Sequence, residues 1–335
     1  MRSYRFGVSA CMTVCMAILG ASALNAETLT VEGIYGSRVS MSGDIEVIAM
    51  ENLGGNVGPD VALDLSEALG SVYIVGKPYF RIVPASLVGA TQVVVIDRSE
   101  GGAEQLRVDN PNAPDAVLRG SVRLTSQDRR VKDRVDKKCI AKDDRGKCIE
   151  REEVRTRCDE FVVRLNPRIQ LIAVDGTQLY SKTNQRSETI RYCADENADI
   201  DPDAMADKMV GELIAEIRAD IAPNERREDI RIMENRKNLQ RSDRNAFRAA
   251  VKLTDEDPNS ACDAFEALEA SNPTQVAVLF NIGLCFEGAG ELVVAQEYYN
   301  RALESDPGRD YPTWGLQRIE SRYRGEAQME AREQG

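Results

Sequence analysis

Apolar and polar residues follow three different patterns along this 335-residue chain, which predicts three successive regions. Residues 8–24 form one apolar or small run without any charge. From 45 to 221, short apolar stretches with strand-like alternation are separated by turns and by two stretches with helical spacing. After residue 240, the apolar positions recur at helical spacing. This order predicts a leader, then an α+β domain, then a helical domain.

The α+β domain is expected over residues 27–223, with a three-layer-like arrangement, a mixed sheet and a long β-hairpin. Its two helices are predicted at 60–72 and 201–221, because apolar residues recur there every three or four positions. Alternating or continuous apolar stretches bounded by turn residues predict its strands. These strands are 45–50, 80–83, 93–96, 116–124, 161–165, 169–174 and 178–192.

Residues 125–160 are densely charged with both signs, for which disorder is one interpretation. We favour an exposed β-hairpin, because Cys139 and Cys148 flank a turn at 143–146. Residues that face each other in an antiparallel pair lie within reach of a disulfide. A second turn at Asp175-Gly176 predicts a returning strand whose end, Cys193, is placed to reach Cys158.

The N-terminus has the pattern of a signal peptide. Arg2 and Arg5 precede the apolar run, and small residues end it near Ala26. We therefore expect residues 1–26 to be cleaved and the mature chain to be exported to the periplasm, with association at the periphery of the outer membrane. An uncleaved N-terminal anchor is the alternative interpretation. No later stretch is long and apolar enough for a spanning helix.

Composition narrows the chemistry further. The chain has no histidine, which excludes His-based triads and His-ligated zinc, and its net charge of −12 argues against nucleic-acid binding. An even number of cysteines in an exported chain predicts disulfides, and six cysteines allow fifteen pairings. No C-x-x-C pair or EF-hand spacing indicates a metal site. The six cysteines of the expected mature chain are Cys139, Cys148, Cys158, Cys193, Cys262 and Cys285.

No catalytic or cofactor site emerges, so we expect a non-enzymatic protein without cofactors. Glycines at 54–58 lie between a strand and a helix, as in phosphate-binding loops, but the G-x-G-x-x-G and Gly-Lys-Ser/Thr patterns are missing. A plain turn is the preferred interpretation. Ser181 and Lys182 are consecutive in a predicted strand, where they point to opposite faces.

Residues 274–307 form a 34-residue unit whose small, aromatic and breaking residues are similar to the tetratricopeptide repeat. They include Asn281, Gly283, Tyr299 and Pro307. At an offset of 34, residues 240–273 form a second, weaker unit, and 311–324 are expected to add a capping helix. The helical domain is therefore expected over 240–330, after a charged linker or exposed helix at 224–239.

The resemblance to tetratricopeptide repeats implies antiparallel helix pairs with a concave, protein-binding groove. Gln275 and Asn281 are the positions that we expect to be exposed in that groove and to bind a partner. Cys262 and Cys285 fall at ends of neighbouring helices that should meet, so we expect them to form a disulfide. Two buried free thiols are the alternative.

The stretches IEVIAMENLGG, AVLRGSV and LNPRIQLIAVDGTQLYS resemble the curli-secretion channel (CsgG-like) superfamily. Its relatives include periplasmic activators of peptidoglycan synthases and the N-terminal domain of the Tol-Pal β-propeller protein. The resemblance, over about residues 30 to 223, implies an envelope location and a protein-binding α/β domain. The charged hairpin is unsuited to hydrocarbon, so we do not expect a pore.

We therefore expect an exported periplasmic scaffold or adaptor that binds other envelope proteins during secretion or surface-polymer assembly. An oligomeric component of a curli-like secretion channel is the alternative, and a homo-oligomer is compatible with either.

Overall fold

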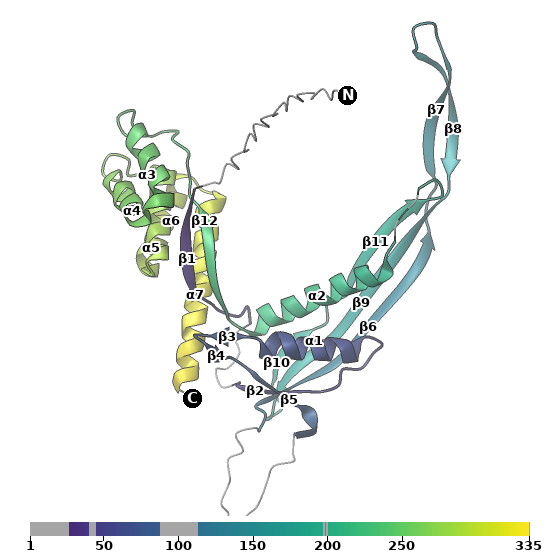
Figure 1. The fold of residues 1–335 in the computed structure, drawn as a ribbon, viewed down its shortest axis with the longest axis horizontal. Helices are drawn as coiled ribbons and strands as arrows, with labels where there is room; N and C mark the ends of the chain where they lie inside the picture. The colour runs from purple at the N-terminus through teal and green to yellow at the C-terminus, as the bar shows by residue number, and fades with distance from the viewer. Residues whose placement is uncertain (1–26, 40–44, 88–112, 197, 199, 335) are drawn as a thin grey trace, which may run out of the picture.

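The computed structural model describes residues 27–39, 45–87, 113–196, 198 and 200–334 (Figure 1). It confirms the α+β class. The predicted signal peptide, 1–26, and the predicted strand 93–96 lie outside the described residues. The main sheet has the strand order β10-β9-β6-β2-β5, and β11 also pairs with β9.

The main sheet is mixed, as the sequence predicts. Strand β2 (Val47–Met50) is parallel to both β5 (Arg81–Pro84) and β6 (Ala116–Arg130). Strand β6 is antiparallel to β9 (Cys158–Ala173). The other antiparallel partners of β9 are β10 (Gln178–Lys182) and β11 (Arg186–Cys193), and smaller elements are β3 (Tyr73–Ile74), β4 (Lys77–Pro78) and η1 (Ala85–Leu87).

Helices α1 (Gly58–Gly70) and α2 (Pro202–Ile221) cover one face of this sheet (Figure 1). Their apolar stripes meet alternate residues of β6 and β9 in one core. That core includes Leu65, Leu213, Leu118 and Leu165, all fully buried. The described part of the domain therefore has two layers, helices on a sheet, and not three.

The glycine-rich loop before α1 pairs with the sheet. The Gly54 N–H donates to the Gly120 carbonyl, and the Val122 N–H donates to the Gly54 carbonyl, at 2.9 and 2.8 Å. Gly55 has φ +94°, and a Cβ there would overlap the carbonyl of Val122. Only glycine adopts this conformation so close to another backbone without strain. These glycines thus have a structural role.

Residues 224–231, expected as linker or exposed helix, are wrongly assigned by the sequence pattern. They form strand β12 (Asn224–Arg231), which is antiparallel to β1 (Thr28–Tyr35) over eight residue pairs. The sequence pattern misses β12 because its residues are mostly charged. A two-stranded ribbon leaves most of its side chains in solvent, so no apolar alternation is needed. The backbone groups of β1 require a partner, and β12 supplies it.

The helical domain contains α3 (Arg244–Glu256), α4 (Pro258–Ala267), α5 (Val276–Gly288) and α6 (Leu292–Ser305), followed by α7 (Asp310–Gln334). Its core includes Phe247, Phe265, Phe280 and Tyr299. Helix α7 continues ten residues beyond the expected cap at 311–324. Its C-terminal part reaches the α+β domain, where the Gln328 carboxamide oxygen accepts the Ser37 N–H at 3.0 Å.

Candidate protein-binding site

The part of α5 that the repeat pattern predicts to line an open groove is covered by the chain itself. Asn281 accepts the Met233 N–H at 2.8 Å and donates to the Met233 carbonyl at 3.0 Å. Gln275 donates to the carbonyls of Asn235 and Lys237, each at 3.1 Å. Asn281 is 0% exposed and Gln275 is 8% exposed. Our expectation that both residues are open to a partner is therefore wrong.

The occupant is the stretch 232–239, which we call the internal segment. Its residues Ile232, Met233 and Leu239 are buried in the same core as the repeat helices. Two helix pairs present more apolar surface than they bury against each other. The internal segment, together with Leu29 and Val31 of β1, covers that surface. The repeat pattern in the sequence does not predict this occupant. The side-chain amides of Asn281 and Gln275 bind backbone groups, which any extended segment provides.

A polar cluster fastens the end of the internal segment. Asp243 accepts from the Ser271 hydroxyl at 2.5 Å and from the Asn272 amide at 2.7 Å. Asn272 in turn accepts the Gln240 N–H at 3.1 Å. The hydrogen bonds from Ser271, Asn272 and Ser242 lower the pKa of the Asp243 carboxyl. The carboxylate is therefore favoured in the folded state.

Glu287 is fully buried and joins three helices. It accepts from the Tyr299 hydroxyl at 2.6 Å and binds the Arg318 guanidinium through two contacts at 2.8 and 2.7 Å. Burial, followed by the charge of Glu287, raises the pKa of Tyr299. The Tyr299 hydroxyl and both carboxylate oxygens of Glu287 are hydrogen-bonded within this cluster, so Tyr299 serves packing, as the repeat pattern indicates, and not ligand stacking.

Ser181 and Lys182 do not form a nucleophile pair. Lys182 faces α2 and contacts Glu216 at 2.9 Å and Asp220 at 3.2 Å. Burial and the hydrogen bond to Asp220 raise the pKa of the neighbouring Tyr180. These charges hold β10 to α2.

The six cysteines form three disulfides: Cys139–Cys148, Cys158–Cys193 and Cys262–Cys285. The last joins α4 to α5, as expected from the register of the repeats. The first two settle the pairing that the sequence leaves open. Cysteine pairing of this kind is typical of chains that fold in an oxidising compartment.

The arm, the β-hairpin of β7 (Arg134–Lys142) and β8 (Cys148–Thr156), has mostly exposed residues and no buried ones. It extends beyond the ends of the long strands (Figure 1). Its apolar side chains lie in solvent, with Ile140 55% and Ile149 66% exposed. The Cys139–Cys148 disulfide, with a Cα–Cα distance of 5.8 Å, links its two strands near the tip. A two-stranded ribbon is only marginally stable by itself in water, so this link matters.

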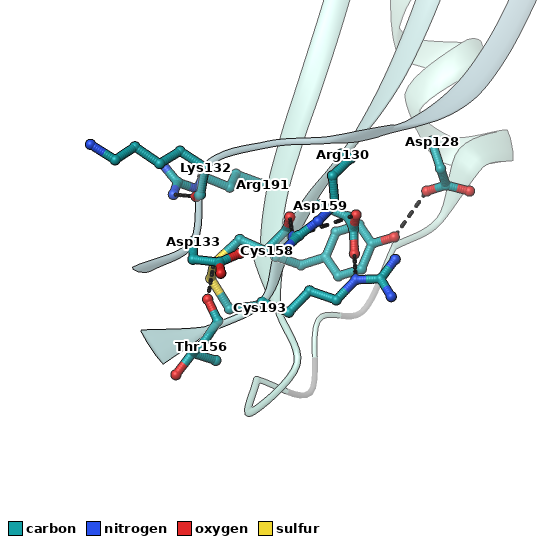
Figure 2. A network of polar contacts seen from close by, with 11 residues as sticks. Asp128, Arg130, Lys132, Asp133, Thr156, Cys158, Asp159, Arg191 and Cys193 are labelled. Carbon is teal, nitrogen blue, oxygen red and sulfur yellow. Dashed lines mark hydrogen bonds and ion pairs between the residues drawn. A yellow bond between two sulfur atoms is a disulfide. The ribbon is translucent and has the colours of Figure 1, made fainter. Parts of the chain in front are cut away.

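Polar contacts fix the arm where it leaves the sheet (Figure 2). The Cys158–Cys193 disulfide lies between directly paired residues of β9 and β11. Arg130 donates to the Cys158 carbonyl and pairs with Asp133. Arg191 donates to the Lys132 carbonyl at 2.9 Å.

A second group of contacts begins at the first residue of the arm. Arg134 pairs with Asp136 at 2.8 Å and with Asp195 at 2.5 Å, and it also pairs with Glu196. The hydrogen bond to Asp136 is the largest cause of the raised pKa of Arg134. Arg134 therefore joins the arm to the loop after β11. Together with the disulfide, these pairs connect the base of the arm to the end of the main sheet.

Among the residues that the structure describes, no helix is both long and apolar enough to cross a membrane. Within the same residues, no group of three or more Cys, Asp or Glu side chains is arranged to hold a metal ion.

No protein-family model matches the chain, and no curated protein matches it. One similar solved structure is the solution NMR structure of the uncharacterized lipoprotein B from Nitrosomonas europaea. The two chains are 12% identical, the match covers 54% of this chain and 80% of that chain, and the TM-score is 0.17. A TM-score this low supports no conclusion about fold or function. The resemblances to the CsgG-like superfamily and to tetratricopeptide repeats therefore stay predictions.

Proposed function

We propose that this protein is an exported, non-enzymatic scaffold of the cell envelope that binds a protein partner through the tip of its arm. The observation that carries this proposal is the arm itself. It exposes Ile140 and Ile149 at its far end, while ion pairs and a disulfide brace its base. A braced projection with exposed apolar side chains is suited to contact another molecule.

The edges of the arm agree with this role. Within the described chain, β7 pairs with β8 and with no other strand, so each has an open edge. Open edges invite uncontrolled pairing unless charges protect them. Lys137 and Lys138 on β7, and Glu152 and Glu153 on β8, supply such charges. The arm thus keeps its apolar tip available for a specific partner and resists self-aggregation.

Export is supported by the three disulfides and by the signal-peptide pattern of residues 1–26. The periplasm is the compartment that this pattern favours. Partners among other envelope proteins follow from that location. The alternative, an oligomeric component of a secretion channel, would require large assemblies, which light scattering of the purified protein detects.

A pair of matched variants tests the role of the arm. Ile149→Asp changes the tip, and Val293→Asp changes a side chain of nearly equal exposure on α6, 65% against 66%. Both are surface changes that should leave the fold intact. We expect Ile149→Asp to lose the partners that co-purify with the wild-type protein from envelope fractions, and Val293→Asp to retain them. The opposite result would move the partner site to the repeats and overturn the proposal.

A further inference from the structure

The two longest strands of the main sheet have one apolar face and one strongly basic face. In β6 and β9, the residues that point towards α1 and α2 are mainly apolar. Because successive side chains in a strand point to opposite faces, the intervening residues lie on the face away from these helices. On β6 these include Arg119 and Arg123, and on β9 they include Arg164 and Arg168. We call these four residues the arginine ladder.

The pairing register orders the ladder. Arg119 lies opposite Gln170, Ser121 opposite Arg168, Arg123 opposite Asn166, and Thr125 opposite Arg164. Each successive pair therefore holds one arginine and one neutral polar residue. The arginines alternate between the two strands, and each step along the sheet is two residues, or roughly 7 Å. The result is a zigzag of positive charge.

The ladder has no counter-charge in the described chain. None of its four arginines makes an ion pair or a side-chain hydrogen bond with another described residue. The contrast with other arginines of the same sheet is clear. Arg129, farther along the same face of β6, pairs with Glu160 at 2.5 Å, and Arg186, on the helix-covered face, pairs with Glu212 at 3.5 Å. Glu160 is the sole acidic residue on this face of β6 and β9.

Unpaired arginines on one face are unexpected for an acidic protein. The chain carries a net charge of −12, so neutralising acids are abundant elsewhere on its surface. Arg119, Arg123 and Arg168 are exposed and Arg164 is half-buried, so the ladder is open to solvent. Like charges held this close repel one another, and an anionic ligand removes that repulsion.

We propose that the arginine ladder binds an extended acidic peptide segment in which every second residue is a carboxylate. Same-face side chains of an extended peptide are separated by the same two-residue step as the ladder. Guanidinium groups bind carboxylates through two parallel hydrogen bonds, which makes the spacing selective. The intervening Ser121, Asn166 and Gln170 offer hydrogen bonds to the peptide backbone.

The composition of this face favours a peptide over other polyanions. Single-stranded nucleic acids are bound on aromatic side chains, and neither β6 nor β9 places an aromatic residue on this face. A lipid surface needs an apolar stripe beside the cations, whereas the residues between the arginines are polar. The ladder and the arm are separate surfaces, so either proposal can hold without the other.

The experiment measures binding of a ten-residue peptide that alternates Glu and Thr, at low and at physiological salt. The same composition arranged as a Glu block and a Thr block is the control peptide. The protein variant combines Arg119→Gln, Arg123→Gln, Arg164→Gln and Arg168→Gln. Its matched control has the same change of charge on exposed arginines of the helical region and the segment before it: Arg236→Gln, Arg241→Gln, Arg244→Gln and Arg248→Gln.

We expect the ladder variant to bind the alternating peptide at least about tenfold more weakly than wild type, because four charge pairs are lost. The control variant and Ile149→Asp should each remain within about twofold, and the blocked peptide should bind more weakly than the alternating one. Equal binding by both four-fold variants, or no binding by wild type at low salt, would overturn the proposal. Tighter ladder-dependent binding of oligothymidylate or of anionic vesicles would overturn it as well.

Discussion

Two polar regions of this protein, the predicted groove of the helical domain and the face of the main sheet that carries the arginine ladder, differ in what lies against them. In the predicted groove, the side chains of Asn281 and Gln275 form hydrogen bonds with the backbone of the internal segment. On the sheet, four arginines have no partner in the described chain. Polar side chains that have partners within the chain stabilise the fold, whereas those without such partners stay available to bind another molecule.

This difference changes which region is expected to bind partners. The repeat pattern places the partner site in the groove, whereas the structure places the chain's own residues 232–239 there. In the described chain, the arm and the arginine ladder are two exposed surfaces that we propose as partner sites instead. Substitutions in the groove should therefore affect stability, and substitutions on the ladder should affect binding.

The largest effect is expected from Asn281→Ala. The change leaves both the N–H and the carbonyl of Met233 buried without partners, which should lower the free energy of unfolding by about 3 kcal/mol. Denaturant unfolding followed by the fluorescence of Trp314, the single tryptophan, measures it. Asn300→Ala, on the exposed side of α6, is the control and should change stability by less than about 0.5 kcal/mol. Equal effects of the two variants would mean that Asn281 does not fasten the internal segment.

A somewhat smaller loss is expected when Cys262 and Cys285 are both changed to Ser. The disulfide joins residues 23 positions apart, and the loop-entropy model gives roughly 2–3 kcal/mol after allowance for relaxation. Calorimetry of the double variant measures the loss. The matched double change at Cys139 and Cys148 lies in the exposed arm, so the unfolding of the helical core should be unaffected by it. A helical core that is destabilised equally by both would contradict the separation of arm and core.

Acid should weaken the fastening of the internal segment. The pKa of Asp243 is lower in the folded state than in the unfolded chain. Its stabilising contribution is therefore present at neutral pH and is lost as the pH falls below about 4, through the folded-state pKa. Asp243→Asn should flatten this part of the stability profile, measured by unfolding at pH 7 and pH 3. Asp263→Asn, at an exposed site on α4, should leave the profile unchanged, and a similar flattening there would refute the assignment.

The smallest effect on stability is expected from the four-fold ladder variant. Its arginines make no ion pairs with other residues that the structure describes, so removing their charges should change the free energy of unfolding by less than about 1 kcal/mol. The loss of repulsion between the arginines contributes favourably to that change. The same unfolding measurement checks this. A loss comparable to that of Asn281→Ala would show that the ladder is structural and would remove the contrast between the two surfaces.

Periodicity in the sequence predicts much of the fold, because burial of one face is a local pattern. The spacing of Leu65 and Leu69 marks α1, and the alternation in 116–124 marks β6. The charged arm is also predicted, since two cysteines flank a turn. Strand β12 is missed because most of its side chains are exposed to solvent. Its strand conformation depends on backbone pairing with β1, which leaves no pattern in the sequence.

The candidate sites are less predictable, because they depend on which segments meet. Asn281 fits a repeat pattern whose groove is usually open, and only the three-dimensional path of 232–239 shows that it is closed. The alternation of Arg119 and Arg123 is visible in the sequence. The strand register alone shows that Arg164 and Arg168 lie beside them and that neither β6 nor β9 places an acidic residue among the four.

Site-specific photo-crosslinking in living cells tests the proposed function most directly. A photoreactive amino acid at Ile149 places the probe on the tip of the arm, and the same residue at Val293 places it on the outside of the repeats. We predict a discrete crosslinked protein from position 149 and none from position 293. Crosslinks from position 293 alone would contradict the account, because the partner would then contact the repeats and not the arm.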